Sequence, residues 1–379
     1  MKKLLIPVLV LVLFNTCSTG RQESISPVRV STSTDYYNAA MDYARTFEAS
    51  GFKDQQTYQK AIDYFEEVLF IEKLNADAWY NIGRVLFYGG EYSRAKESFR
   101  NAIRYRRNFV ESYSLLTRTL LIEEKLDQAT SVAEKAYENI PNNEIIMNDL
   151  ATVYIKTERY DEAKDLVSSI IKKNSKFTPA YITLGNIFYI QKKYELARLV
   201  YLKAVDEGDD SGELYTNMGL VAMHTEDKDS TLNYFKKGVE KAVGNPYTHL
   251  NLANFFMSTG DYESAVAEFD LALKFSPMMI EAVIGEGAAY MQLKLLDKAE
   301  ELYKKAISIN PDYPETYFNY GILVADYRGD KSQAVSFFNK FIELKGALLD
   351  KGHRVYKYIE EIKAERIKPT KKARSKKKK

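Results

Sequence analysis

Residues 76–109 read ADAWYNIGRVLFYGGEYSRAKESFRNAIRYRRNF, and this stretch decides the fold. Its first half carries a bulky, an apolar and a small residue, and its second half carries a small, an aromatic and a small residue. The two sets are Trp79, Ile82 and Gly83, followed by Ala95, Phe99 and Ala102. Both sets have the spacing of one helix face, and the Gly89-Gly90 pair between them is a turn signal. The stretch therefore predicts two helices joined by a short turn.

The same pattern recurs with a period of 34 residues, without a gap, from position 76 to position 314. The other first-helix triplets are Tyr113, Leu116 and Thr117; Met147, Leu150 and Ala151; Tyr181, Leu184 and Gly185; Tyr215, Met218 and Gly219; His249, Leu252 and Ala253; Val283, Glu286 and Gly287; and Tyr317, Tyr320 and Gly321. Prolines such as Pro277 and Pro311 stand where the next unit begins. A fixed period of this length indicates stacked copies of one helical hairpin, each packed on its neighbours.

The pattern resembles the tetratricopeptide repeat, whose signature is a bulky residue, Leu, Gly and Tyr on the first helix, Ala and Phe on the second, and Pro in the link. The resemblance covers residues 35–347. It implies an all-α, right-handed superhelical solenoid of about nine helix-turn-helix repeats with a concave groove. The repeats start near positions 35, 76, 110, 144, 178, 212, 246, 280 and 314.

The repeats at the two ends of the array are irregular. Extra residues separate the two helices of the first repeat, and one residue is inserted near 328–330 in the last. The unit at 212–245 departs most from the pattern, since Thr231 and Gly238 replace the usual alanines. We expect local loosening there.

The segments outside the array are expected to export, anchor and cap it. Residues 1–16 have the charged start and apolar run of a bacterial signal peptide, too short to span a bilayer. Cys17 follows in a relaxed lipobox, Leu13-Phe14-Asn15-Thr16-Cys17, so the resemblance to bacterial lipoproteins implies lipidation of its thiol; ordinary signal cleavage is the alternative. Residues 17–34 would form a flexible tether. An apolar stripe of Val355, Ile359 and Ile362 predicts a capping helix over 348–367, and residues 368–379 a basic disordered tail.

Composition excludes several classes of chemistry. The formal charge is +2, but the tail and leader hold ten of the basic residues, which leaves −8 on residues 4–367. No basic face typical of nucleic-acid-binding domains is present. One cysteine excludes an intrachain disulfide or a thiolate zinc site, and the three histidines never stand at metal-ligand spacing. We expect no metal, no cofactor and no catalytic residues, hence no enzyme; His249 takes a bulky packing place of the repeat.

The resemblance implies that the second, fifth, ninth and twelfth residues of each first helix line the groove. We therefore expect these partner-binding residues: Tyr80, Arg84, Phe87, Arg118, Asn148, Asn186, Tyr189, Leu220, Met223, His224, Asn254, Met257 and Met291. No lysine occupies a fifth place, so the carboxylate clamp of chaperone-binding relatives is absent. The surface suits an amphipathic helix or an apolar peptide segment. Alternatively, many of these side chains are half-buried by the solenoid itself.

The sequence thus favours an exported scaffold or assembly factor of the cell envelope, periplasmic or on the outer membrane, that is anchored by lipid and holds a protein segment in its groove. The basic tail either docks on an anionic membrane or other polyanion, or only increases solubility; export makes nucleic acid the less favoured ligand. Two alternatives remain: a soluble intracellular adaptor whose tail contacts nucleic acid, and a carrier of small apolar ligands.

Overall fold

The computed structural model describes residues 32–225, 228–242 and 244–367. Within these ranges the regular structure is entirely helical, with nineteen α-helices, one π-helical and one 3₁₀ segment, and no strand. The described chain divides into two compact units that meet in sequence between Lys241 and Ala242, here called the N-terminal and C-terminal units. The expected all-α solenoid is confirmed, whereas the predicted leader and its Cys17, most of the tether and the basic tail lie outside the described residues.

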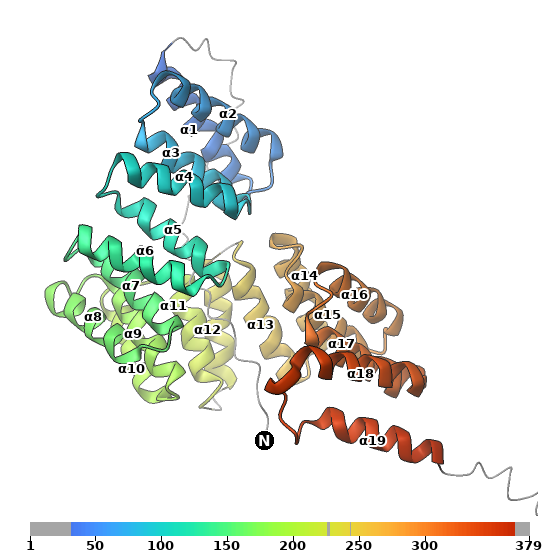
Figure 1. The fold of residues 1–379 in the computed structure, drawn as a ribbon. Coiled ribbons are helices and arrows are strands. Elements are labelled where there is room, and N and C mark those ends of the chain that lie inside the picture. The colour runs from blue at the N-terminus through green and yellow to red at the C-terminus, as the bar shows by residue number, and fades with distance from the viewer. Residues whose placement is uncertain (1–31, 226–227, 243, 368–379) are drawn as a thin grey trace, which may run out of the picture. The chain divides into compact units, whose positions relative to one another are not determined.

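In the N-terminal unit, successive antiparallel hairpins stack in chain order, from α1 in blue to α12 in yellow-green (Figure 1). Its helices are α1 (Ser33–Ala49), α2 (Gln55–Ile71), α3 (Ala76–Tyr88), α4 (Tyr92–Tyr105), α5 (Val110–Ile122), α6 (Leu126–Asn139), α7 (Glu144–Lys156), α8 (Tyr160–Lys173), α9 (Thr178–Ile190), α10 (Tyr194–Asp206), α11 (Gly212–Ala222) and α12 (Lys228–Lys241).

The C-terminal unit continues the same hairpin pattern and ends on a single helix. Its elements are α13 (Pro246–Thr259), α14 (Tyr262–Phe275), α15 (Ile280–Gln292), α16 (Leu296–Ile309), α17 (Pro314–Ile322), the π-helical η1 (Leu323–Arg328), α18 (Lys331–Lys345), the 3₁₀ turn η2 (Gly346–Leu348) and α19 (Arg354–Ile367).

In several repeats, a glycine on the first helix faces a large ring on the second. A Cβ on Gly83 would lie 2.7 Å from the ring of Phe99, and one on Gly219 would lie 2.6 Å from the ring of Phe235. Both rings are fully buried. Burying such a ring stabilises the fold by roughly 2–3 kcal/mol, so the glycine's lack of a side chain allows the closest approach of the two helices.

The turn inside each hairpin takes a left-handed residue at one place of the period. Glycine supplies it at Gly90 and Gly260, with φ of 81° and 84°. Glu124, Glu158, Lys192 and Lys294 hold the same place with φ between 56° and 62°. Left-handed backbone is unfavourable for residues with a Cβ, so the geometry of the hairpin imposes it on these four.

The structure revises the expected boundaries at the ends of the array. The extra residues of the first repeat lengthen α1 and α2 to 17 residues each instead of forming a loop. Thr32 caps α1 in a capping box with Asp35, so the helix starts before position 35. The inserted residue of the last repeat is absorbed as the π-helical turn η1.

The predicted stripe of Val355, Ile359 and Ile362 is buried against the C-terminal core, as expected of a cap, but its helix begins at Arg354 and not at 348. The expected loosening at 212–245 stays a prediction, and the structure describes close packing at one of the two positions that suggested it. Gly238 leaves no gap, because a Cβ there would lie 2.6 Å from the Thr216 hydroxyl. That hydroxyl donates a 2.7 Å hydrogen bond to the Gly212 carbonyl.

Candidate functional site

The first helices of the N-terminal unit form a row in which each helix touches the next: α3, α5, α7, α9 and α11. Their second, fifth, ninth and twelfth residues are the positions where a groove is expected. The side chains at these positions therefore define the candidate site of this unit.

At the start of the row, the predicted groove residues already have partners within the protein. Arg84 forms an ion pair with Glu48 of α1 and lies 3.4 Å from Asn81 Oδ1. Tyr80 packs on Phe109, with ring centroids 5.0 Å apart. Phe87 is buried. These contacts give this end of the row a structural role.

The middle of the row holds a group of polar side chains that we call the polar cluster: Arg118, Asn148, Asp149, Asn186 and Glu213. They come from α5, α7, α9 and α11. Burial raises the pKa of both Asp149 and Glu213, and the Arg118 charge opposes the rise in each case, so the Arg118 guanidinium lies near both carboxyl groups. The Arg118 guanidinium also lies over the Phe87 ring, 5.6 Å from its centroid.

Asn186 joins the polar cluster through its amide oxygen, which accepts hydrogen bonds from the Tyr201 hydroxyl at 2.6 Å and from Asn217 Nδ2 at 3.1 Å. Asn217 lies one helical turn beyond Glu213 on α11. The Glu213 charge also contributes to the raised pKa of Tyr201, after burial. Asn186 itself is fully buried. These hydrogen bonds link α9 to α10 and to α11, the helix that carries Glu213.

Burial shifts both carboxyl groups of the polar cluster toward their protonated forms. It raises the pKa of Glu213 to about 8, against the Arg118 charge and with a further increase from Asp209. Burial raises the pKa of Asp149 to about 6, opposed by a hydrogen bond from Ser114 and by Arg118. Such shifts arise where a carboxylate is removed from water without full compensation, and they are common at binding sites.

A second group, the aromatic cluster of Tyr189, Tyr194 and His224, lies at the ends of α9 and α11 and the start of α10. His224 stacks on Tyr194 with ring centroids 4.1 Å apart and planes 6° apart. Its Nε2 lies 3.2 Å from the Tyr189 hydroxyl. Burial lowers the pKa of His224 and raises that of Tyr189 to about 12. Although His224 is exposed, its neutral form is thereby favoured, and the cluster offers flat aromatic surface.

The other predicted groove residues differ in exposure. In the N-terminal unit, Leu220 is buried and Met223 half-buried. In the C-terminal unit, Asn254 is exposed, Met257 half-buried and Met291 buried. Buried positions such as Leu220 and Met291 belong to the packing of the first helices, so accessible surface is concentrated on fewer residues than the spacing predicts.

Two polar side chains of the C-terminal unit stand at packing positions of the repeat and are buried. His249 is buried as expected; its Nδ1 lies 2.7 Å from Glu268 Oε2, and its ring stacks on Phe275. Glu286 stands where the repeat usually places an aliphatic residue and is also buried. Burial, followed by the neighbouring Asp270 carboxylate, raises the pKa of Glu286 to about 7.

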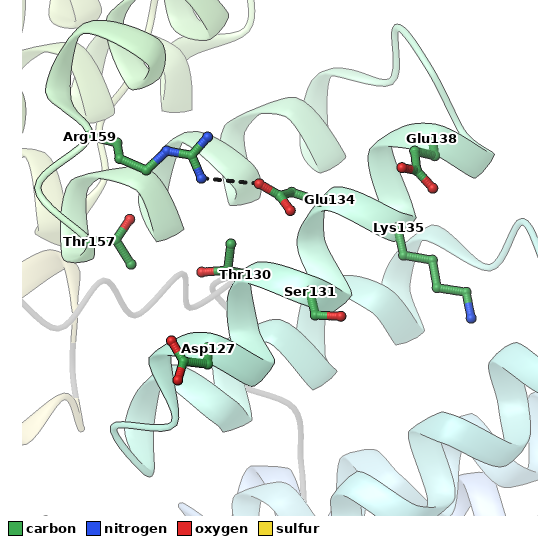
Figure 2. A pocket seen from close by; sticks show the side chains of 8 residues that line it. All are labelled: Asp127, Thr130, Ser131, Glu134, Lys135, Glu138, Thr157 and Arg159. Atoms are coloured by element: carbon green, nitrogen blue, oxygen red, sulfur yellow. Dashed lines mark hydrogen bonds and ion pairs between the residues drawn. The ribbon is translucent and has the colours of Figure 1, made fainter.

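A hollow of about 640 Å³ opens on α6 and the turn after α7 (Figure 2). It is lined by Asp127, Thr130, Ser131, Glu134, Lys135, Glu138, Thr157 and Arg159. Arg159 pairs with Glu134 at 3.1 Å and with Glu162, and its guanidinium lies 3.7 Å from the Tyr154 ring centroid. Because Arg159 is already paired with two carboxylates and the hollow is open to solvent, we place the candidate site at the polar cluster.

Within the described ranges, no three His, Cys, Asp or Glu side chains are grouped so that they could hold a metal ion. No helix in the same ranges combines the length and the apolar character needed to cross a bilayer.

Spacing alone points to part of the polar cluster. Arg118, Asn148 and Asn186 stand at predicted groove positions. Glu213 is the second residue of its repeat, which the same rule counts as a groove position, but it is not among the predicted groove residues. Asp149 is the sixth residue of its repeat, a position where packing is expected, and no sequence motif marks it. Its relevance comes from its proximity to Arg118, which belongs to another repeat.

Comparison with known proteins supports the repeat assignment. Models of the tetratricopeptide repeat match residues 76–109, 120–187, 246–277 and 281–313. The BBSome complex member BBS4 of Bos taurus is 20% identical over 283 residues, 75% of this chain and 54% of that protein. The protein O-mannosyl-transferase TMTC3 of Homo sapiens is 24% identical over 297 residues, 73% of this chain and 32% of that protein. The chain therefore spans about half, or less, of the length of these relatives.

Among solved structures, the hetero-tetramer Cut9-Hcn1 of the APC/C resembles this chain with a TM-score of 0.61 at 12% identity, over 88% of this chain and 67% of that one. At this identity the likeness concerns the fold alone. The repeat models, the regular period and the helical hairpins agree: the matched stretches between residues 76 and 313 are tetratricopeptide repeats.

Proposed function

We propose that the protein is a non-catalytic scaffold that holds a segment of a partner protein on the first-helix row of its N-terminal unit, and that Cys17 anchors it by lipid in the cell envelope. The observation that carries the proposal is the polar cluster. Four successive first helices carry buried polar atoms without hydrogen-bond partners there, and the Phe87 ring lies against Arg118. A polypeptide segment offers both the apolar side chains and the backbone hydrogen-bonding groups that such a surface requires.

The relatives support a role in assembly. The bovine relative is, by its name, a member of a complex. The human O-mannosyl-transferase shares the repeats over only 32% of its length, so its activity does not argue for catalysis here. The histidines of this chain engage in stacking, in a buried contact with Glu268 and in a turn, where His353 Nδ1 accepts a bond from the Val355 N–H. These roles favour scaffolding over chemistry.

The groove proposal is tested by site-specific photo-cross-linking in cells. A photoreactive amino acid at Met223, which is half-buried on the first-helix row, should capture a partner protein. The control places the same amino acid at Leu199, which is 54% exposed on the second helix α10. Equal capture from both positions, or none from Met223, would overturn binding in the groove.

The anchoring proposal is tested by the intact mass of the protein made in a bacterial host, wild type beside Cys17→Ser. We expect a mature chain that begins at Cys17 and carries acyl mass, with the acylation lost in the variant. An unprocessed chain that keeps Met1 would contradict anchoring and would favour an intracellular adaptor.

A further inference from the structure

We infer that the polar cluster binds a cationic side chain, a lysine or an arginine, of the polypeptide segment held by the groove. The inference rests on the proposed function and names the chemistry that the partner segment must carry. Three independent features of the polar cluster point to a cation: its free hydrogen-bonding atoms, its net charge and its surroundings.

The first feature is a set of unpaired buried oxygens, all of which can accept hydrogen bonds once Glu213 is ionised. Among the described residues, four buried oxygens of the polar cluster lack a hydrogen-bond partner: Asn148 Oδ1, Asp149 Oδ2 and both carboxylate oxygens of Glu213. Only two nitrogens are in the same condition, Arg118 Nε and Asn186 Nδ2. Asn148 is 7% exposed and Asn186 is 0% exposed, so neither amide is compensated by bulk solvent. Each unpaired buried group costs about 1–3 kcal/mol. A ligand that donates hydrogen bonds satisfies most of them.

The second feature is charge. With both carboxyls ionised, Arg118, Asp149 and Glu213 carry a net charge of −1, and the Asp209 carboxylate acts on Glu213 as a further negative charge. One bound cation neutralises the three-residue group, whereas an anion would increase the imbalance. A lysine ammonium has three donors and an arginine guanidinium has five, so either can serve several acceptors at once.

The raised pKa values of the two carboxyls fit this arrangement. Without a ligand, burial favours the protonated form of Glu213 near neutral pH. A nearby cation favours the ionised form, so a lysine or arginine would displace that proton and take the place of the missing counter-charge.

The third feature is the apolar surface beside the polar cluster. The Phe87 ring lies against Arg118, with 5.6 Å from its centroid to the guanidinium, and Phe87 is itself buried. Lysine and arginine bury their methylene stems on such surface while the charged end reaches polar groups. The surroundings therefore favour a basic residue flanked by apolar residues over a small free cation.

The test uses the full-length protein and a set of short capped peptides of alternating alanine and leucine that differ only at one central position. That position is lysine, arginine, norleucine or glutamate. We expect the lysine and arginine peptides to bind at least about tenfold more tightly than the norleucine peptide, which corresponds to about 1.4 kcal/mol. Glu213→Gln should remove most of this preference. Glu263→Gln, the same change at an exposed position of the second helix α14, should leave it unchanged.

Glu213→Gln should fold, because it replaces a carboxyl whose protonated form is already favoured; circular dichroism and a melting curve check this, and Asp149→Asn provides a second variant. Equal binding of the lysine and norleucine peptides, or a preference that survives in both variants, would overturn the inference. Absence of any peptide binding would overturn it too. If no peptide binds, the photo-cross-linking experiment at Met223 still tests the proposed scaffold function independently of this inference.

Discussion

The ring of Phe99 occupies the space that a side chain on Gly83 would need: a Cβ there would lie 2.7 Å from both Cδ1 and Cε1 of the ring. The same complementarity runs through the array. Where the first helix carries a larger residue at this place, the second carries a smaller one, so Ala151 is paired with Val167 and Thr117 with Ala133. All four of these side chains are buried. In these repeats the size of one member of the pair therefore limits the size of the other.

We predict that Gly83→Ala destabilises the protein by about 1–2 kcal/mol, because overpacking of the Phe99 ring costs more than the helix propensity gained from alanine. Phe99→Val alone should cost about 2–4 kcal/mol through the cavity it leaves. In the double variant the alanine methyl fills part of that cavity, as in the natural Ala151 and Val167 pair. The double variant should then be more stable than the sum of the two single effects predicts, as measured by urea unfolding. Strictly additive effects would contradict the fit.

One repeat departs from this rule, and the structure explains how. Ala253 pairs with the large Phe269 on the second helix of its repeat. Phe269 is nevertheless fully buried, because Gly285 of the next repeat leaves room for its ring; a Cβ on Gly285 would collide with it. The space for the large Phe269 ring is thus provided by a small residue of the next repeat. Comparison of equivalent places within single repeats could not reveal it.

The same distinction separates what the sequence predicts about the site from what it does not. Periodicity predicts the hairpins, the packing role of His249 and several groove positions, since each is a property of one repeat. The inserted residue near 328–330 is visible in the sequence, but its accommodation as the π-helical η1 depends on how α17 and α18 pack. Asp149 and Glu213 matter because they lie near Arg118, which belongs to another repeat in each case. An alignment of the repeats compares equivalent positions, so it does not reveal contacts between residues of different repeats.

The left-handed hairpin residues give a second prediction. Lys192 has φ of 59° at the place that Gly90 and Gly260 fill elsewhere. Lys192→Gly should stabilise the protein by up to about 1 kcal/mol, since glycine adopts this backbone without a steric penalty, although its greater freedom in the unfolded chain offsets part of the gain. Gly90→Ala is the matched reverse change and should destabilise. Thermal unfolding of both variants measures the effect, and a loss of stability in Lys192→Gly would contradict it.

The ion pair between Lys96 of α4 and Glu123 after α5 gives a third prediction. Lys96 is 7% exposed, and Glu123 also accepts from the Lys125 ammonium at 3.1 Å. Glu123→Gln should destabilise by about 2–4 kcal/mol, because it leaves the buried ammonium without its counter-charge. Lys125→Met removes an exposed partner and should change stability by less than about 1 kcal/mol.

The double variant Lys96→Met with Glu123→Gln decides whether the lost charge is responsible. It should recover most of the stability, since no uncompensated charge remains. Chemical denaturation of the three variants beside wild type gives the comparison. A double variant as unstable as Glu123→Gln would instead assign the loss to the geometry around Glu123.

Glu286 gives a prediction about pH. Burial and the Asp270 carboxylate raise its pKa in the folded protein from 4.5 to about 7. Below pH 4.5 both the folded and unfolded states hold the proton, so the full stability is present. As the pH rises from 4.5 to 7, the unfolded state releases the proton first, and stability falls by about 3 kcal/mol at most. Glu286→Gln should therefore melt at a higher temperature than wild type at pH 8.

The advantage of Glu286→Gln should disappear near pH 4, where the wild-type carboxyl is protonated in both states. Glu263→Gln on the exposed face of α14 is the control, and its melting temperature should follow that of wild type at both values of pH. Asp149 and Glu213 also have raised pKa values. The stability of Glu286→Gln should therefore still decline with rising pH, but less steeply than that of the wild type. A Glu286→Gln variant whose melting temperature differs from wild type by the same amount at both pH values would show that the pKa of Glu286 is the same in the folded and unfolded states.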